Sequence, residues 1–142
     1  MILEKGTPLP EWRLDVVAPA AMKVYAAITR DPSPIHWDRR EVAKRGLGDR
    51  LVNQGPLNLG YVINMLHQWA GPESLRSLQI RFCAPVHEGD AVTAGGVVTS
   101  VRWEQTGWLV DCDVWLVRDD GTRAVTGTAT VAWNEADERR AP

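Results

Sequence analysis

The 142 residues have a balanced composition, with 44% hydrophobic residues, 24% charged residues and a formal net charge of −2. Such a composition is typical of one soluble globular domain spanning residues 1–142, and it excludes a disordered scaffold. The charge balance argues against a nucleic-acid-binding surface, and no apolar stretch reaches the length of a membrane span. Because the N-terminus lacks the pattern of a secretory signal, we expect a cytoplasmic protein.

The first part of the chain predicts one strand and two helices. A short strand covers residues 9–17, and a helix follows over residues 18–30. The prolines of the next segment, residues 31–38, exclude a helix there because each lacks an N–H and restricts the residue before it. A short helix then runs through residues 41–45, with Asp38 as its N-terminal cap.

The most apolar predicted helix begins at Gly55-Pro56 and ends at Gly71-Pro72. Its apolar side chains cover most of its circumference, which is typical of a helix buried inside a domain.

The second half of the chain has the pattern of β-strands. Four strands are predicted, separated by glycine-containing turns, and they cover residues 75–82, 91–103, 108–117 and 124–133. We predict that they pair in chain order as an antiparallel meander. A buried helix followed by such a meander indicates an α+β hotdog fold, in which a sheet wraps around a central helix. Residues 134–142 are expected to fray.

The cysteines and tryptophans are expected to be structural. Cys83 and Cys112 lack the spacing of a metal site, and we expect buried, reduced thiols in predicted strands. Most of the seven tryptophans are expected in the core or at an interface, and five fall in or beside predicted strands: Trp12, Trp103, Trp108, Trp115 and Trp133.

The loop over residues 31–38 is the strongest candidate for chemistry. Asp31 and His36 lie five residues apart on a segment stiffened by proline. A carboxylate and an imidazole held together can bind one water molecule and share its deprotonation. The alternative is a non-catalytic role, in which Asp31 only starts a turn and His36 is partly solvated.

A second candidate lies where the buried helix begins. The N-terminus of a helix presents unpaired N–H groups and a partial positive charge, and these can stabilise a carbonyl oxygen that gains negative charge. Because Pro56 has no N–H, Gly55 is the expected donor. The alternative is an ordinary turn in which Asn53 caps the helix.

Other polar residues carry weaker signals. His67 is expected to be a core or interface residue, and His87 to be solvated in a turn. The arginines of the predicted strands most often pair with acids or face water, although they could also meet an anionic ligand: Arg76, Arg81 and Arg102.

Three stretches of the sequence resemble the MaoC-like dehydratases, a family that includes (R)-specific enoyl-CoA hydratases and hydroxyacyl carrier-protein dehydratase subunits. Asp31-Pro-Ser-Pro-Ile-His-Trp-Asp38 is similar to the family pattern Gly-Asp-x-Asn-Pro-Ile/Leu-His-x-Asp. Val52-Asn-Gln-Gly55 is similar to the segment that opens the central helix. Gln79-Ile-Arg-Phe-Cys-Ala-Pro-Val-His-Glu-Gly-Asp90 is similar to a strand and turn of the family.

The resemblance implies a hotdog enzyme that hydrates a 2-enoyl thioester or dehydrates a 3-hydroxyacyl thioester, with the acyl group on coenzyme A or an acyl carrier protein. Asp31 and His36 take the positions of the catalytic pair, and Gly55 that of the glycine that binds the thioester carbonyl. No metal or redox cofactor is implied. Further residues expected to contact substrate are Ser33, Gln54, Tyr61, Met65, Trp69 and Arg81.

The chain departs from the family pattern at three positions. Gln54 stands where the family usually has His, Ser33 replaces Asn, and Arg30 replaces Gly. The resemblance also implies a homodimer or a heterodimer with another hotdog subunit. Two alternatives remain: a non-catalytic acyl-binding partner subunit, and a hotdog thioesterase. The thioesterase is disfavoured because the central helix lacks the carboxylate that such enzymes usually place there.

Overall fold

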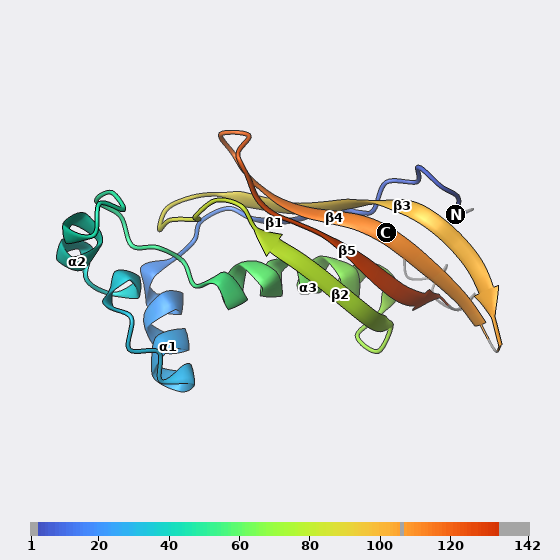
Figure 1. The fold of residues 1–142 in the computed structure, drawn as a ribbon, viewed down its shortest axis with the longest axis horizontal. Coiled ribbons are helices and arrows are strands. Elements are labelled where there is room, and N and C mark those ends of the chain that lie inside the picture. The colour runs from blue at the N-terminus through green and yellow to red at the C-terminus, as the bar shows by residue number, and fades with distance from the viewer. Residues whose placement is uncertain (1–2, 106, 134–142) are drawn as a thin grey trace.

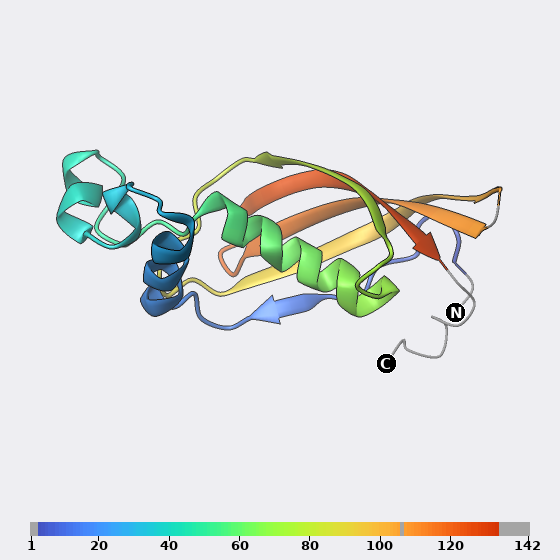
Figure 2. The same ribbon diagram turned by 90° about the horizontal axis from the view of Figure 1, so that it is seen from below.

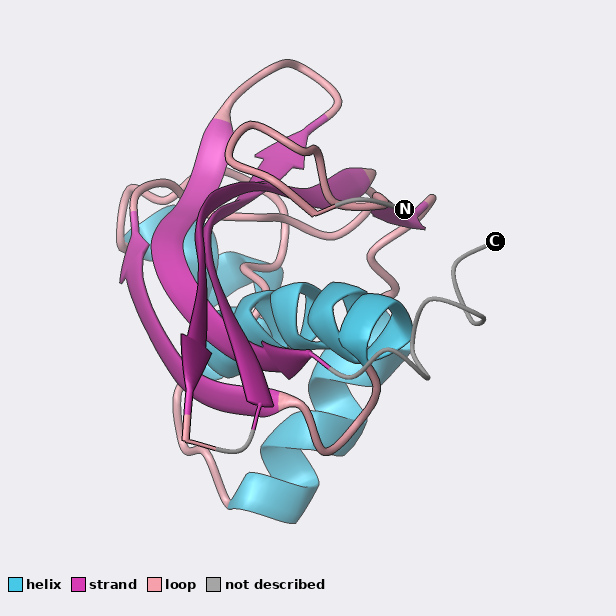
Figure 3. Cartoon of the chain, turned by 90° about the vertical axis from the view of Figure 1, so that its right-hand side faces the viewer, coloured by secondary structure: helices cyan, strands magenta, loops and turns pink. Residues whose placement is uncertain are grey.

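The computed structural model describes residues 3–105 and 107–133, and its main feature is an antiparallel sheet curled around one long helix, α3 (Gly55–Ala70). The sheet has five strands in the order β1-β3-β4-β5-β2. Figure 3 shows the strands curving around the helix, and Figure 2 shows the helix lying along the inner face of the sheet. The predicted α+β hotdog fold is confirmed.

Four of the five strands closely match the predicted ones. They are β2 (Leu75–Phe82), β3 (Val92–Glu104), β4 (Gly107–Arg118) and β5 (Arg123–Trp133). The opening strand is shorter than predicted, since β1 covers only Trp12–Leu14. Pro10, two residues before it, has no N–H and interrupts the ladder, which resumes with the hydrogen bond from Leu9 N to Gly96 O (2.9 Å).

The predicted meander is wrong for β2, which pairs with β5 and not with β3. Only β3, β4 and β5 follow one another as neighbours. The connection over residues 83–91 leaves the sheet and binds another segment, through the hydrogen bonds Asn53 N to Val86 O (2.7 Å) and Glu88 N to Leu51 O (2.9 Å). It therefore carries the chain from β2, at one edge of the sheet, across to β3, next to the opposite edge, instead of closing a tight hairpin.

The core forms where the inner face of the sheet meets α3. Alternate residues of β4 point inward, as the two-residue period of a strand requires, and are 0–1% exposed: Val110, Cys112, Val114 and Leu116. The helix contributes a buried face: Val62, Met65, Leu66, Trp69 and Ala70. Trp69 packs on Trp133 with 5.0 Å between ring centroids. The helix is therefore held by apolar burial, the dominant stabilising term in folding.

The remaining helices gather beyond one end of the sheet, as Figure 1 shows. They are α1 (Pro19–Thr29), the short 3₁₀ helix η1 (Pro34–His36) and α2 (Arg39–Lys44). The predicted cap of α2 is confirmed, because the Asp38 side chain accepts a hydrogen bond from the Arg40 N–H. We call residues 31–54, which include η1 and α2, the overhang.

The cysteines and the exposed tryptophans differ from part of the expectation. Both cysteines are free, but only Cys112 is buried, and Cys83 is exposed just after β2. Burial raises the pKa of Cys112 to about 12, so this thiol stays protonated and packs as a small apolar group. Trp103 and Trp108 are 59% and 39% exposed and contact each other at the end of the β3–β4 hairpin.

We expect Gly127→Ala to destabilise the pairing of β2 with β5. A Cβ at Gly127 would lie 2.1 Å from the backbone oxygen of Gln79, so a strand must shift. Overpacking of this kind typically costs about 1–3 kcal/mol in the free energy of unfolding, which urea denaturation measures. Gly60→Ala in α3 is the matched control, because a Cβ there meets nothing within 4 Å. Equal stability of the two variants would contradict the close strand contact.

Candidate functional site

Asp31 and His36, predicted as a pair from the sequence, lie side by side in the structure. His36 Nε2 is 3.4 Å from Asp31 Oδ2. The side chain of His36 is 10% exposed and that of Asp31 is 29% exposed, so the pair is sheltered but open to a small molecule from the carboxylate side. This arrangement can hold and polarise one water molecule.

The backbone of the overhang determines which nitrogen of His36 carries the proton. His36 Nδ1 lies 2.6 Å from the carbonyl oxygen of Val52. Since a carbonyl oxygen only accepts hydrogen bonds, Nδ1 is the donor. In the neutral ring, Nε2 is then the unprotonated nitrogen, and it faces Asp31. The geometry therefore prepares Nε2 as a proton acceptor.

Asp31 is positioned by the way α1 ends. Arg30 has left-handed backbone angles (φ 53°, ψ 39°) and closes the helix, and the Asp31 N–H donates to Ala26 O at 3.0 Å. The other carboxylate oxygen, Oδ1, accepts the N–H of Ser33 at 2.9 Å. Ser33, predicted to contact substrate, thus holds Asp31 through its backbone.

The beginning of α3 is fastened to α1 through Gln54, which is the N-terminal cap residue. Its side chain is 1% exposed, and its Nε2 donates to the backbone oxygen of Met22 at 2.9 Å. Gln54 therefore joins the start of α3 to α1. Its expected contact with substrate stays a prediction. The alternative in which Asn53 caps the helix is wrong.

Gly55 occupies the first turn of α3, where N–H groups have no partner within the helix. The ring of Phe82, at the end of β2, lies against it: a Cβ on Gly55 would be 3.0 Å from Phe82 Cζ. Phe82 is 55% exposed, so part of its ring lies at the surface next to Gly55. No sequence pattern predicts this contact of Phe82 with Gly55, because β2 and α3 meet only in the folded chain.

A polar cluster lies behind the first turn of α3. Asn53 Nδ2 donates to Asn58 Oδ1 (2.8 Å) and to the Tyr61 hydroxyl (3.2 Å). Tyr61 stacks on Trp12 with 5.4 Å between ring centroids, and burial raises its pKa. Tyr61 is thus held by Asn53 and Trp12, and its expected contact with substrate stays a prediction.

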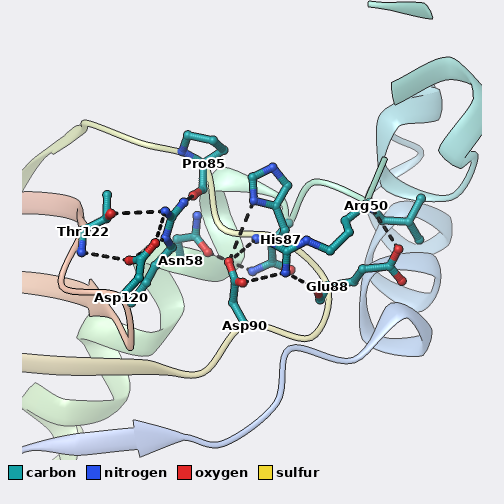
Figure 4. Close-up of polar contacts among 11 residues, drawn as sticks. Arg50, Asn58, Pro85, His87, Glu88, Asp90, Asp120 and Thr122 are labelled. Atoms are coloured by element: carbon teal, nitrogen blue, oxygen red, sulfur yellow. Dashed lines mark hydrogen bonds and ion pairs between the residues drawn. The ribbon is translucent and has the colours of Figure 1, made fainter. Parts of the chain in front are cut away.

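The overhang is bound to the turn between β2 and β3 through the buried carboxylate of Glu88. Glu88 accepts two hydrogen bonds of 2.6 Å from Arg39 and one of 3.0 Å from the Leu51 N–H. The bonds from Arg39 are the main cause of the lowered pKa of Glu88. Arg50 donates to Glu88 O and to Asp90 Oδ1, as Figure 4 shows. No sequence pattern marks Glu88, because its partner Arg39 lies 49 residues away in the chain.

The other candidates lie in different surroundings. Met65 and Trp69 are 1% and 3% exposed within the core, and Arg81 is exposed on β2. Their contact with substrate stays a prediction. His87 was expected to be solvated, and this is wrong: its side chain is 14% exposed, and burial is the main cause of its lowered pKa. The turn that carries it is covered by the overhang, which sequence patterns do not reveal.

Two negative findings apply to residues 3–105 and 107–133. No three His, Cys, Asp or Glu side chains of this part gather so as to hold a metal ion. None of its helices is long and apolar enough to cross a membrane.

Comparison with known proteins identifies relatives of this arrangement. Residues 5–110 match the family model described as MaoC like domain. No curated protein sequence matches the chain.

Solved structures agree with the family model. One chain of the ChsH1–ChsH2 complex from Mycobacterium tuberculosis is 27% identical with a TM-score of 0.79, over 94% of this chain and 100% of that one. The (R)-hydratase from A. caviae involved in PHA biosynthesis is 25% identical with a TM-score of 0.80, over 93% and 98%. The R-hydratase PhaJ1 from Pseudomonas aeruginosa, 22% identical with a TM-score of 0.78 over 94% and 84%, shares the fold.

The lowered pKa of Glu88 predicts a loss of stability in acid. The folded state keeps this carboxylate charged below its ordinary value of 4.5, so its contribution is present above that pH and is lost as the pH falls through the lowered pKa. Glu88→Gln should make the unfolding free energy depend less on pH in this window, as measured by urea titrations at several pH values. Glu11→Gln, at an exposed position, is the control; a pH slope unchanged in Glu88→Gln would contradict the role of the buried carboxylate.

Proposed function

The chain belongs to the MaoC-like domain family, and we propose that it hydrates 2-enoyl thioesters or dehydrates 3-hydroxyacyl thioesters, because one of its structural relatives is an (R)-hydratase. The observation that carries this proposal is that Asp31 Oδ2 and His36 Nε2 lie 3.4 Å apart while His36 Nδ1 is bonded to the carbonyl oxygen of Val52. The acyl carrier is coenzyme A or an acyl carrier protein, and the chemistry uses no metal or redox cofactor.

The pair can move both protons that the reaction requires. In hydration, a water molecule held between Asp31 and His36 bonds through its oxygen to C3 of the enoyl thioester. The pair takes one proton from this water and supplies one proton to C2. The net change is the addition of one hydrogen and one hydroxyl across the double bond. Dehydration follows the same steps in reverse.

Negative charge that develops on the thioester oxygen needs a donor, and Gly55 supplies it. Its N–H belongs to the first turn of α3, where the helix also contributes a partial positive charge. A fixed donor of this kind stabilises the enolate-like transition state more than the ground state. Because Pro56 has no N–H, the backbone of Gly55 is the donor closest to the start of the helix.

We propose that the active form is a dimer with a second hotdog subunit, identical or different. This rests on the relative solved as the ChsH1–ChsH2 complex. It is also supported by large apolar side chains exposed on α1 and the overhang: Val24, Ile28, Trp37 and Leu47. Since this chain has both members of the catalytic pair, it would be the catalytic subunit of a heterodimer.

Asp31→Asn should abolish hydration of crotonyl-CoA, because the amide keeps the size of the side chain but does not accept the proton. The loss of enoyl absorbance near 263 nm measures the reaction. The matched control is Asp49→Asn, at an exposed position of the overhang. Activity retained in Asp31→Asn would overturn the assignment, and turnover by neither the natural chain nor the variant would favour the non-catalytic partner.

His36→Ala should lower kcat/KM by ~10²–10⁴, the usual contribution of an acid–base group. The same assay measures the loss, and circular dichroism checks that the overhang stays folded. His67→Ala in α3 is the control, since that histidine lies outside the pair. A loss smaller than about tenfold would show that His36 is structural.

A further inference from the structure

Glu88 binds two segments of the overhang that flank the hydrogen bond of His36. Arg39 lies three residues after His36, and Leu51 lies directly before Val52, the partner of the His36 ring. Both segments bond to the one carboxylate of Glu88, Arg39 through two bonds of 2.6 Å and Leu51 through its N–H at 3.0 Å. We propose that Glu88 is a positioning residue that orients His36 for the reaction. This inference rests on the function proposed above.

The backbone next to Glu88 transmits this constraint. The Leu51 carbonyl oxygen accepts the N–H of Glu88 at 2.9 Å, so Glu88 holds Leu51 at both its N–H and its C=O. Further along the same backbone, the Asn53 N–H donates to Val86 O at 2.7 Å. Because the N–H and C=O of a planar trans peptide point in opposite directions, that bond aims the Val52 carbonyl away from Val86 and toward the imidazole.

His36 is therefore held at one nitrogen while its other nitrogen faces the carboxylate. Val52 O binds Nδ1, and Nε2 lies 3.4 Å from Asp31 Oδ2. Asp31 also borders a pocket of about 480 Å³, so the carboxylate side of the pair is open to a small molecule. A ring released from Val52 could carry its proton on either nitrogen, and the tautomer protonated on Nε2 could not accept a proton there.

The constraint depends on the charged form of the Glu88 side chain. This side chain is 10% exposed, whereas that of Arg39 is 60% exposed, so the buried partner is the carboxylate. Gln has nearly the same size, but its NH₂ group would face a guanidinium, which only donates hydrogen bonds. Arg39 then loses at least one of its two bonds, and a buried donor is left without an acceptor.

Glu88→Gln should lower kcat for hydration of crotonyl-CoA by about tenfold to a hundredfold, the scale expected when a catalytic group is misplaced, and leave KM nearly unchanged. A change in kcat without a change in KM is typical of an interaction that matters in the transition state. Nitrogen NMR of isotope-labelled protein at about pH 8, where an ordinary histidine is neutral, should show His36 protonated on Nδ1 in the natural chain and a mixture of tautomers in the variant.

Glu41→Gln is the matched control, because it makes the same substitution in the overhang at a residue that pairs with Lys44. Arg39→Lys is a second test in case Glu88→Gln does not fold: it keeps the charge of an exposed side chain but loses the two-bond geometry. It should change kcat and the tautomer in the same direction.

A kcat and a tautomer in Glu88→Gln that match those of Glu41→Gln, or a change in KM alone, would overturn the proposal. The tautomer is measured without turnover, which separates this inference from the proposed reaction. A natural chain that does not hydrate crotonyl-CoA would refute the hydratase, while the NMR comparison of the two variants would still decide whether Glu88 positions His36.

Discussion

The candidate site depends on the buried carboxylate of Glu88 and on its hydrogen bonds to the exposed side chain of Arg39 and to the Leu51 N–H. The overhang lies beyond the end of the sheet, and only a few of its side chains, among them Val42 and Leu51, join the core formed by α3 and the strands. Glu88 binds it at two points, the guanidinium of Arg39 and the N–H of Leu51. A buried carboxylate is costly unless such hydrogen bonds satisfy it, so this contact favours one docked position of the overhang.

With the overhang in this position, its backbone orients the side chain of His36 and leads into Gly55 at the start of α3. Val52 follows Leu51 directly, and its carbonyl oxygen accepts the hydrogen bond from His36 Nδ1. The same stretch continues through Gln54, which is bonded to α1, into Gly55 at the start of α3. The proposed proton acceptor, His36, and the proposed N–H donor to the substrate carbonyl, Gly55, are therefore held through neighbouring residues of one segment. Such preorganisation lowers the entropy cost of bringing reacting groups together.

Local sequence signals predicted most of the secondary structure and the site pair. Prolines and glycines marked the ends of the helices, and two-residue alternation marked four strands, because these features act within a few residues. The pairing of β2 with β5 was missed, because a strand pattern does not specify its partner when the connection leaves the sheet. The burial of His87 was missed because the overhang covers it from a distant part of the chain.

The sequence by itself determined the buried helix, the strands, and the presence of Asp31, His36 and Gly55 in segments suited to catalysis. Only the tertiary structure decided which His36 nitrogen faces Asp31, how Phe82 stands beside Gly55, and where a pocket opens next to the pair. The physical reason is range: helix ends, turns and strand periodicity depend on neighbouring residues. The tautomer of His36, the contact of Phe82 with Gly55 and the pocket beside Asp31 depend instead on residues that are distant in the sequence and meet only in the folded chain.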